Sequence, residues 1–192
     1  MIILKRWLRE IVSLFVFIKY KNIWNLYYYL HNNKKYSGPS ASAYYNYLER
    51  HCSFIGINAV LEEPPYLPHN LNGIFISNGS KIGKGCVIFQ QVTIGSTSTI
   101  GSKNNGAPTI GDNCYIGAGA KIIGNVHIGN NVRIGANAVV TKDIEDNCTV
   151  IGNPMIVTKK DEVLDNRFIT NDEFGNEIYW DHQERKFKPY KK

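Results

Sequence analysis

The sequence predicts a parallel β-solenoid, a coil of short strands stacked into a triangular prism. Three observations indicate this. An aliphatic residue recurs at almost every sixth position, a small or β-branched residue follows it four places later, and a glycine follows it directly in most units. A period of six fits neither the 3.6-residue helix nor an alternating strand, and it is typical of a solenoid in which three hexads make one coil. The aliphatic series is Ile76, Ile82, Ile88, Ile94, Ile100, Ile110, Ile116, Ile122, Ile128, Ile134 and Val140.

The period also predicts how the prism packs. We expect each aliphatic side chain to point inward and to stack on its equivalent one coil, about 18 residues, away, at the strand spacing of about 4.8 Å. Glycine and asparagine are expected at the corners, where the backbone often needs a positive φ.

Residues 1–53 are predicted to form a separate helical segment. Met1–Asn32 is rich in apolar and aromatic residues and predicts two short helices. Its longest nearly uncharged run, Ile11–Ile18, is too short to span a bilayer, and Glu10 interrupts any signal-peptide pattern. A third helix is predicted to run to about His51, with Ser40 as its N-cap.

The positive charge of the chain lies in this segment. Residues 1–52 carry eight Lys and Arg side chains against two acidic ones, whereas the rest carries 14 of each. This distribution excludes a basic nucleic-acid groove on the solenoid. We expect residues 1–31 either to contact an anionic membrane surface or to pack on the solenoid end or a neighbouring subunit. The corresponding location is cytoplasmic, with or without attachment to the inner face of the membrane.

The solenoid is expected to occupy residues 54–157. Phe54–Tyr66 reads as an imperfect first coil that ends in a turn bearing Glu62 and Glu63. Ile100 and Ile110 are ten residues apart, so four residues are inserted within 101–109, and this polar stretch predicts a projecting loop.

Residues 158–192 are predicted to form a polar extension, in which Arg167–Thr170 and Glu177–Trp180 pair as a hairpin. No function is assigned to it. The four cysteines show no metal-binding spacing, and Cys86 and Cys114 fall on inward positions, so we expect buried thiols and no metal site.

Several motifs resemble the hexapeptide-repeat acyltransferases, and most closely their serine acetyltransferase-like branch. The resemblance covers Phe54–Val157 and implies a mainly β fold, a left-handed parallel β-helix, which is an exception to the usual right-handed crossover. The motifs are Pro68-His69-Asn70-Leu71-Asn72-Gly73-Ile74, Phe89-Gln90-Gln91-Val92-Thr93-Ile94-Gly95, Pro108-Thr109-Ile110-Gly111-Asp112-Asn113 and Ile116-Gly117-Ala118-Gly119-Ala120.

This resemblance implies transfer of an acetyl group from the co-substrate acetyl-CoA to an acceptor hydroxyl. His69 matches the catalytic histidine of the family and would act as general base. It stands four residues before Gly73, where the family more often has three. A carboxylate that orients the imidazole is expected at Glu62 or Glu63. The other histidines, His31, His51, His127 and His182, are interpreted as surface or helix residues, although His127 faces outward from a coil and is also a candidate to line the groove.

The resemblance also implies a coenzyme A site along a groove between coils. Small residues would let the pantetheine arm approach the backbone, a terminal Gly-x-Pro would turn against the adenine, and a lysine would meet a phosphate. The residues expected in these roles are Gly117, Ala118, Gly135, Ala136, Gly152, Pro154, Lys142, Lys159 and Lys160.

A solenoid offers no deep pocket of its own, so the sites are expected between prisms, which favours a homotrimer. In the resembling family the inserted loop crosses to the adjacent subunit.

The acceptor expected from the sequence is a sugar hydroxyl, on a surface polysaccharide or its precursor. Serine acetyltransferases usually have Asp before the catalytic histidine and Arg-His before the loop proline. Here these positions are Pro68, Gly106 and Ala107, so the cation that would select an amino-acid carboxylate is missing. Free serine, as in cysteine biosynthesis, is the alternative acceptor. The non-enzymatic alternative is a solenoid scaffold or binding protein, which needs neither His69 nor the loop.

Overall fold

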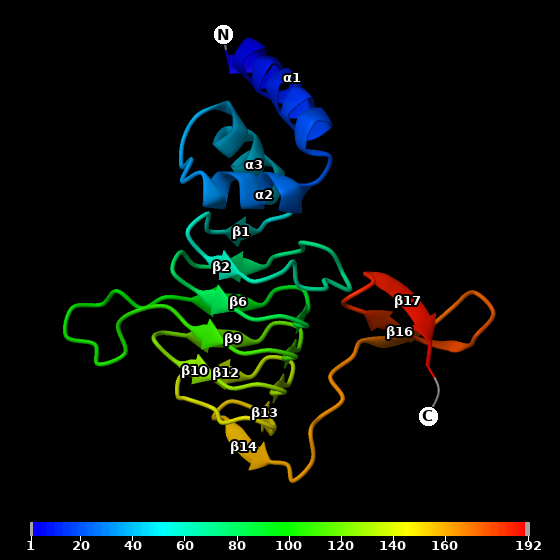
Figure 1. The fold of residues 1–192 in the computed structure, drawn as a ribbon. Helices are drawn as coiled ribbons and strands as arrows, with labels where there is room; N and C mark the ends of the chain where they lie inside the picture. Colours follow the sequence, from blue (N-terminus) through cyan, green and yellow to red (C-terminus); the bar gives the residue numbers. More distant parts are fainter. Residues whose placement is uncertain (1, 191–192) are drawn as a thin grey trace.

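The computed structural model describes the backbone of residues 2–190 and the side chains of residues 10–190. Three helices form the amino-terminal segment: α1 (Ile2–Tyr20), α2 (Ile23–Asn32) and α3 (Pro39–Arg50). α2 and α3 cover one end of the prism, and α1 lies beyond them (Figure 1). Three helices were expected, but α1 is longer than the short helix predicted there.

Local chemistry sets the helix ends. The side chain of Asn22 accepts a hydrogen bond from the Asn25 N–H (2.9 Å) and caps α2. The prediction of Ser40 as the cap of α3 was wrong. That helix begins at Pro39, after Gly38, with no side-chain cap, because proline is well suited to the first helical position.

Buried tyrosines join the helices to the first coil. Tyr27 of α2 donates its hydroxyl to the Ala59 carbonyl (2.6 Å), and Tyr44 of α3 donates to the Ile55 carbonyl (3.0 Å). Both side chains are fully buried. Packing on the solenoid end, one of the alternatives expected for residues 1–31, is therefore confirmed for α2, and α3 packs there as well.

The prism has three parallel faces, as the six-residue period predicts. The first face contains β1 (Phe54–Ile55), β3 (Phe75–Ile76), β6 (Thr93–Gly95), β9 (Lys121–Ile123) and β12 (Val139–Val140). The second contains β2 (Val60–Leu61), β4 (Lys81–Ile82), β7 (Thr109–Ile110) and β10 (His127–Ile128). The third contains β5 (Val87–Ile88), β8 (Tyr115–Ile116), β11 (Arg133–Ile134), β13 (Cys148–Ile151) and the antiparallel β14 (Ile156–Lys159).

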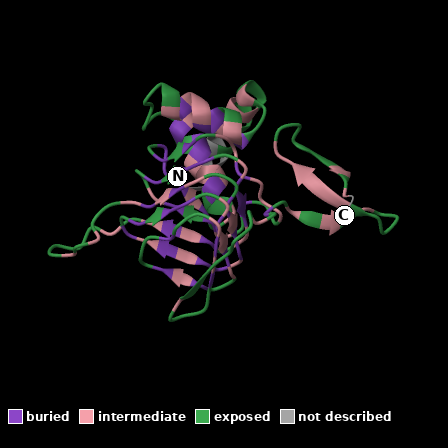
Figure 2. Cartoon of the chain, turned by 60° about the horizontal axis from the view of Figure 1, so that its bottom comes forward, coloured by how far each residue is buried: buried purple, intermediate pink, exposed green. Residues whose placement is uncertain are grey.

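The aliphatic residues stack in register inside the prism. Ile76 pairs with Ile94, Ile82 with Ile110, and Ile88 with Ile116. All six side chains are at most 2% exposed, and the buried core runs through the prism into the helices (Figure 2). Cys86 and Cys114 are buried free thiols, as predicted.

The inserted loop is longer than the sequence spacing indicated. Ile94 and Ile110 lie on consecutive faces although sixteen residues separate them, so ten residues are inserted instead of four. Ile100, predicted to be inward, is fully exposed in the loop. Thr97 and Gly106 pair across the base of the loop, which projects from the prism in Figure 1.

The extension folds as an antiparallel sheet of β15 (Ile169–Asn171), β16 (Glu177–Asp181) and β17 (Lys186–Pro189). The predicted hairpin is confirmed, and a third strand accompanies it. Upstream of this sheet, the buried Asn166 amide donates to the Asn113 carbonyl (2.9 Å) and accepts from Arg133 Nε (3.1 Å). These bonds fix the segment that leads to the sheet against the prism.

Candidate active site

His69 lies in the turn that joins the third face to the first face in the first coil. Asn70 and Gly73 adopt positive φ angles of 55° and 69°, which asparagine and glycine tolerate best. The Gly73 N–H donates to the His51 carbonyl (3.0 Å), and Asn72 Nδ2 donates to the His69 carbonyl (2.7 Å). The turn is therefore held from both sides, and the His69 side chain is exposed on it.

The His69 ring has one hydrogen-bonding partner in the structure. Its Nδ1 lies 2.6 Å from Gln90 Oε1. Because an amide oxygen only accepts, Nδ1 carries the proton in the neutral ring, and Nε2 keeps its lone pair. Phe89 contacts the same ring edge-on, with centroids 5.6 Å apart. The ring is therefore set to accept a proton at Nε2.

The carboxylate partner expected at Glu62 or Glu63 is not the partner that the structure provides. Both glutamates lie at the opposite end of the third face, beyond Tyr66. Glu63 accepts from the Gly85 N–H (2.7 Å), and Glu62 lies 4.0 Å from the Lys84 ammonium. Glu62 and Glu63 precede the third face in the chain, whereas His69 follows it. The glutamates and the histidine therefore lie on different edges of the prism.

His182 is more buried than the surface role assigned to it. Its Nδ1 lies 3.7 Å from Glu63 Oε1, and both ring nitrogens are buried without a hydrogen-bonding partner. Burial lowers the pKa of His182, and the nearby Glu63 carboxylate opposes this effect. No sequence pattern predicts this pair, because the two residues are far apart in the chain.

The edge of the prism that carries His69 also carries most of the small residues expected to contact coenzyme A. This edge consists of residues 67–74, 89–92, 117–120, 135–138 and 152–155. Three backbone bonds of 2.9 Å join its coils: Gln91 N–H to Asn72, Gly119 N–H to Gln90, and Asn137 N–H to Ala118. We call it the His69 edge. The predicted residues on it are Gly117, Ala118, Gly135, Ala136, Gly152 and Pro154.

Close stacking explains the glycine on this edge. A Cβ on Gly117 would lie 2.7 Å from the Ala136 nitrogen, closer than real Cβ contacts. Below Gln90, the edge therefore presents backbone and methyl groups, with little side-chain bulk. A slender chain can lie against such a surface.

The predicted lysines lie on other edges. Lys142 follows β12 on the edge that carries the inserted loop. Lys159 pairs with Glu145, whose hydrogen bond raises the lysine pKa, on the edge that precedes the third face. Lys160 follows it there, and its N–H donates to the Asn147 carbonyl.

Lys121 is a cation beside the His69 edge that sequence reasoning missed. It begins β9, and its Nζ donates to the Gln91 carbonyl (2.7 Å), next to the Gln90 that holds His69. Its position directly before an inward isoleucine was a signal that its side chain points outward.

The carboxy-terminal sheet contributes aromatic rings beside this edge, which the sequence reading also missed. Phe168 lies 6.0 Å from Phe89, and Trp180 stacks on Tyr66 at 4.4 Å.

Among residues 2–190, no three His, Cys, Asp or Glu side chains come together as a metal-binding group.

Comparisons with known proteins agree with the fold and the repeat. The family model described as bacterial transferase hexapeptide (six repeats) matches residues 107–142. The fold is a left-handed parallel β-helix, and residues 107–142 match the hexapeptide-repeat class. Within that class it resembles the serine acetyltransferases.

Three solved structures illustrate this resemblance. The serine acetyltransferase of Neisseria gonorrhoeae is 29% identical over 72% of this chain and 51% of its own, with a TM-score of 0.60. The Brucella abortus enzyme is 25% identical over 74% and 56%, with a TM-score of 0.64. The soybean enzyme is 27% identical over 70% and 55%, with a TM-score of 0.60.

The chain thus spans about half the length of these enzymes. No curated protein matches it significantly by sequence.

Proposed function

We propose that this protein transfers an acetyl group from acetyl-CoA to an acceptor hydroxyl, with His69 as general base. The observation that carries the proposal is the hydrogen bond from His69 Nδ1 to Gln90, which leaves Nε2 to accept a proton. The likeness to serine acetyltransferases supports the same reaction class.

The reaction needs one proton carrier. His69 Nε2 takes the acceptor hydroxyl proton as the oxygen attacks the thioester carbonyl carbon. The C–O bond forms, the C–S bond breaks, and the imidazolium returns the proton to the leaving sulfur. Gln90 orients the ring through a neutral dipole, so it fixes the tautomer without adding a countercharge.

The His69 edge suits the pantetheine arm. Gly117, Ala118, Gly135 and Ala136 stack on it below His69, and Gly152 and Pro154 follow at its lower end. Lys121 is the cation that the described side chains place beside this edge for a phosphate or carbonyl oxygen.

A complete site needs a second copy of the chain. The inserted loop leaves the edge between the first and second faces, whereas His69 lies on the edge between the third and first. The loop of one prism therefore reaches the His69 edge of another more readily than its own. A closed homotrimer provides three such contacts and brings Lys142, which shares the loop edge, toward the neighbouring site.

The comparisons favour serine as the acceptor, since the resembling solved structures are serine acetyltransferases. A sugar hydroxyl is the second candidate. It is favoured by Pro68, Gly106 and Ala107, where no cation can pair with an amino-acid carboxylate. An acceptor on a surface polysaccharide or its lipid-linked precursor would be reached by a protein at the inner face of the cytoplasmic membrane.

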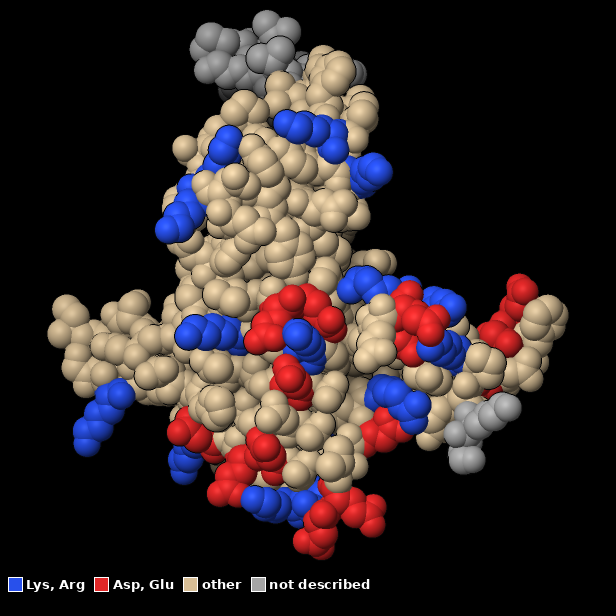
Figure 3. Space-filling view, in the orientation of Figure 1, with Lys and Arg blue, Asp and Glu red and all other residues tan. Residues whose placement is uncertain are grey.

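Peripheral membrane contact is part of this second candidate. α1 exposes an apolar stripe of Ile11, Leu14, Phe15 and Ile18, each 48–66% exposed. We call the helices α1–α3 the helical cap. On the face shown in Figure 3, it carries Lys and Arg but no acidic side chains. The side chains of residues 1–9 lie outside the described residues. No described helix is both long and apolar enough to cross a bilayer.

The membrane contact is tested by flotation with vesicles rich in phosphatidylserine. We expect the intact protein to float and Leu14→Glu/Phe15→Glu to remain in solution, because the stripe would then carry charge. Phe174→Glu, at an exposed position in the turn between β15 and β16, is the matched control. Equal flotation of both variants would exclude contact through α1.

The reaction is tested by thiol release from acetyl-CoA with serine and with mono- and oligosaccharides. We expect His69→Ala to lower turnover by about 10²–10⁴-fold while circular dichroism stays unchanged. Glu173→Ala, at an exposed position in the turn between β15 and β16, is the control. Normal turnover of the His69 variant would remove this residue from the mechanism.

A further inference from the structure

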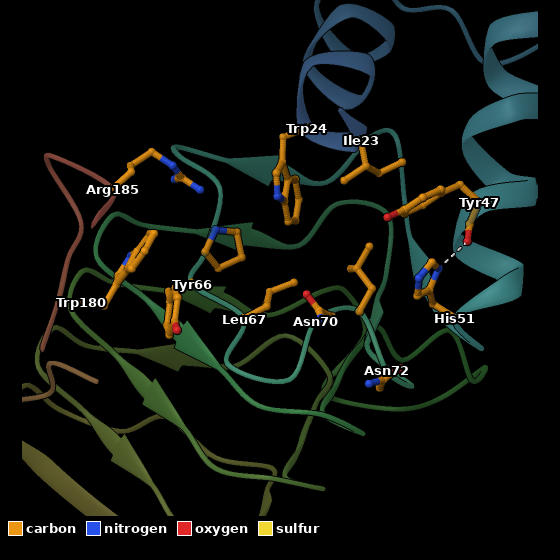
Figure 4. Close-up of a pocket in the computed structure, with 12 residues that line it drawn as sticks. Ile23, Trp24, Tyr47, His51, Tyr66, Leu67, Asn70, Asn72, Trp180 and Arg185 are labelled. Atoms are coloured by element: carbon orange, nitrogen blue, oxygen red, sulfur yellow. Dashed lines mark hydrogen bonds between the residues drawn. The ribbon is translucent and has the colours of Figure 1, made fainter. Parts of the chain in front are cut away.

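A cavity lies between the helical cap, the His69 turn and the carboxy-terminal sheet (Figure 4). Its volume is about 460 Å³, within the range of small-molecule sites. Trp24 of α2 lies above it, Tyr66 and Trp180 lie at one end, and Tyr47 and His51 lie at the other. We call it the cap pocket.

We propose that the cap pocket binds one sugar ring of an oligosaccharide or polysaccharide, next to the ring whose hydroxyl reacts at His69. Binding of the glycan is independent of the reaction, whereas this role for it rests on the proposed acetyl transfer.

The lining matches the two kinds of surface on a pyranose ring. One face of a pyranose carries C–H groups, and such an apolar face packs on aromatic rings. Trp24, Tyr66 and Trp180 are all partly exposed and supply three rings from three separate segments. The rim of a pyranose carries hydroxyls, which both donate and accept.

The polar lining can meet such hydroxyls. Asn70 and Asn72 bring amide groups that both donate and accept. His51 Nδ1 lies 2.9 Å from the Tyr47 carbonyl and must donate to it, so Nε2 is the acceptor in the neutral ring. No lining residue is acidic, and Arg185 is the single Lys or Arg.

Free serine would fit this lining poorly. It would fill a small part of the cavity, and its ammonium group would meet no carboxylate. A nucleotide would bring several phosphate charges to one guanidinium, whose Nη1 already donates to the Pro64 carbonyl (3.1 Å). An uncharged, hydroxyl-rich ring fits both the apolar and the amide groups.

The position of the pocket defines which sugar it holds. Asn70 directly follows His69, and Asn72 donates to the His69 carbonyl, so the pocket and the imidazole share one turn. The His69 ring, however, faces Gln90 and does not line the pocket. A ring in the pocket is therefore displaced from the general base, and the reacting hydroxyl belongs to a neighbouring unit of the same chain.

This arrangement gives the carboxy-terminal extension a role. Arg185 fastens the sheet to the turn that precedes the third face, through the Pro64 carbonyl, and Trp180 is positioned by its stacking on Tyr66. The extension thus supplies one end of the pocket, and the helices supply the other side.

Binding is tested first on a glycan array with the full-length protein, followed by titration of the best glycan against tryptophan fluorescence. Two of the three tryptophans line the pocket, so we expect a saturable change in emission. Asn70→Gly removes one amide and keeps a residue that tolerates φ 55°. We expect it and Trp180→Ala to raise Kd by about tenfold, as for the loss of one good contact.

Phe174→Ala is the matched control, since this ring lies in the turn between β15 and β16 of the same extension, is 81% exposed and is outside the pocket. We expect its Kd to be unchanged. Failure of the folded wild-type protein to bind any arrayed glycan, or equal Kd for Asn70→Gly and the control, would overturn the proposal.

Activity separates this inference from the proposed function. If the pocket acts as inferred, Asn70→Gly and Trp180→Ala raise KM for a tetrasaccharide while KM for a monosaccharide hardly changes. Thiol release with serine but no glycan binding would leave acetyl transfer standing and remove the pocket proposal. Glycan binding without thiol release would leave the pocket proposal standing and remove acetyl transfer.

Discussion

Gln90 provides the sharpest test of the proposed mechanism. Replacing it with leucine removes the Oε1 atom that lies 2.6 Å from His69 Nδ1 and keeps most of the side-chain volume. One hydrogen bond between exposed groups contributes about 0.5–1.5 kcal/mol. If that energy holds the ring in its reactive tautomer and orientation, Gln90→Leu lowers kcat by about two- to twelvefold.

The assay is steady-state thiol release at saturating acetyl-CoA. Gln90→Glu keeps an acceptor at this position, so we expect it to retain more activity than Gln90→Leu. Gln91→Ala removes the adjacent amide while preserving the backbone carbonyl that holds Lys121, and it is the control. Unchanged kcat for Gln90→Leu, with the fold intact, would refute the positioning of His69 by this residue.

Three further predictions concern packing, the loop and the carboxy-terminal sheet. Gly117→Ala places a Cβ 2.7 Å from a backbone nitrogen and should lower unfolding stability by about 1–3 kcal/mol. Gly135→Ala meets the Ile151 Cγ2 methyl at 3.1 Å and the Val150 carbonyl oxygen at 3.3 Å and should cost less; equal Tm values would contradict this. Replacing residues 98–103 with Asn-Gly keeps the Asn104 hydrogen bonds to Ile123 and Asn125, so it should leave Tm unchanged and reduce kcat/KM. Full activity would show that the loop does not contribute to the site. Burial depresses the folded-state pKa of His182, so the unfolded chain binds its proton first, and stability should fall as the pH drops below about 6.5, the unfolded value. Glu63 and Asp181 oppose this lowering of the pKa, and Arg185 adds to it. Trp180 emission during urea unfolding at pH 7.5 and 5.5 should show the loss of stability in the wild type and a smaller loss of stability in His182→Gln.

The repeat made the prism predictable, because inward isoleucines at a fixed spacing leave few other ways to bury them. The exception was Ile100. Ile100 continues the six-residue series by coincidence. Its full exposure and the pairing of Ile94 with Ile122 show that the chain has left the regular coil before Ile100. Sequence spacing therefore underestimated the loop.

The active-site prediction was limited by geometry that spacing does not carry. Glu62 and Glu63 are near His69 in sequence, yet the length of the third face separates them from it. Gln90 lies twenty-one residues further on and meets His69 because it occupies the same edge one coil below. In a coiled fold, neighbours are found about eighteen residues away more often than four or six.

The site of the loop insertion has a consequence for how such a protein can vary. The extra residues leave the prism at a single corner, and the chain returns in register: Ile94 and Ile122 stack although they are 28 residues apart. The interior is thus insensitive to how many residues are spliced in there. The sequence of that segment can therefore change, through mutation or engineering, to suit a different acceptor while the fold of the prism is kept.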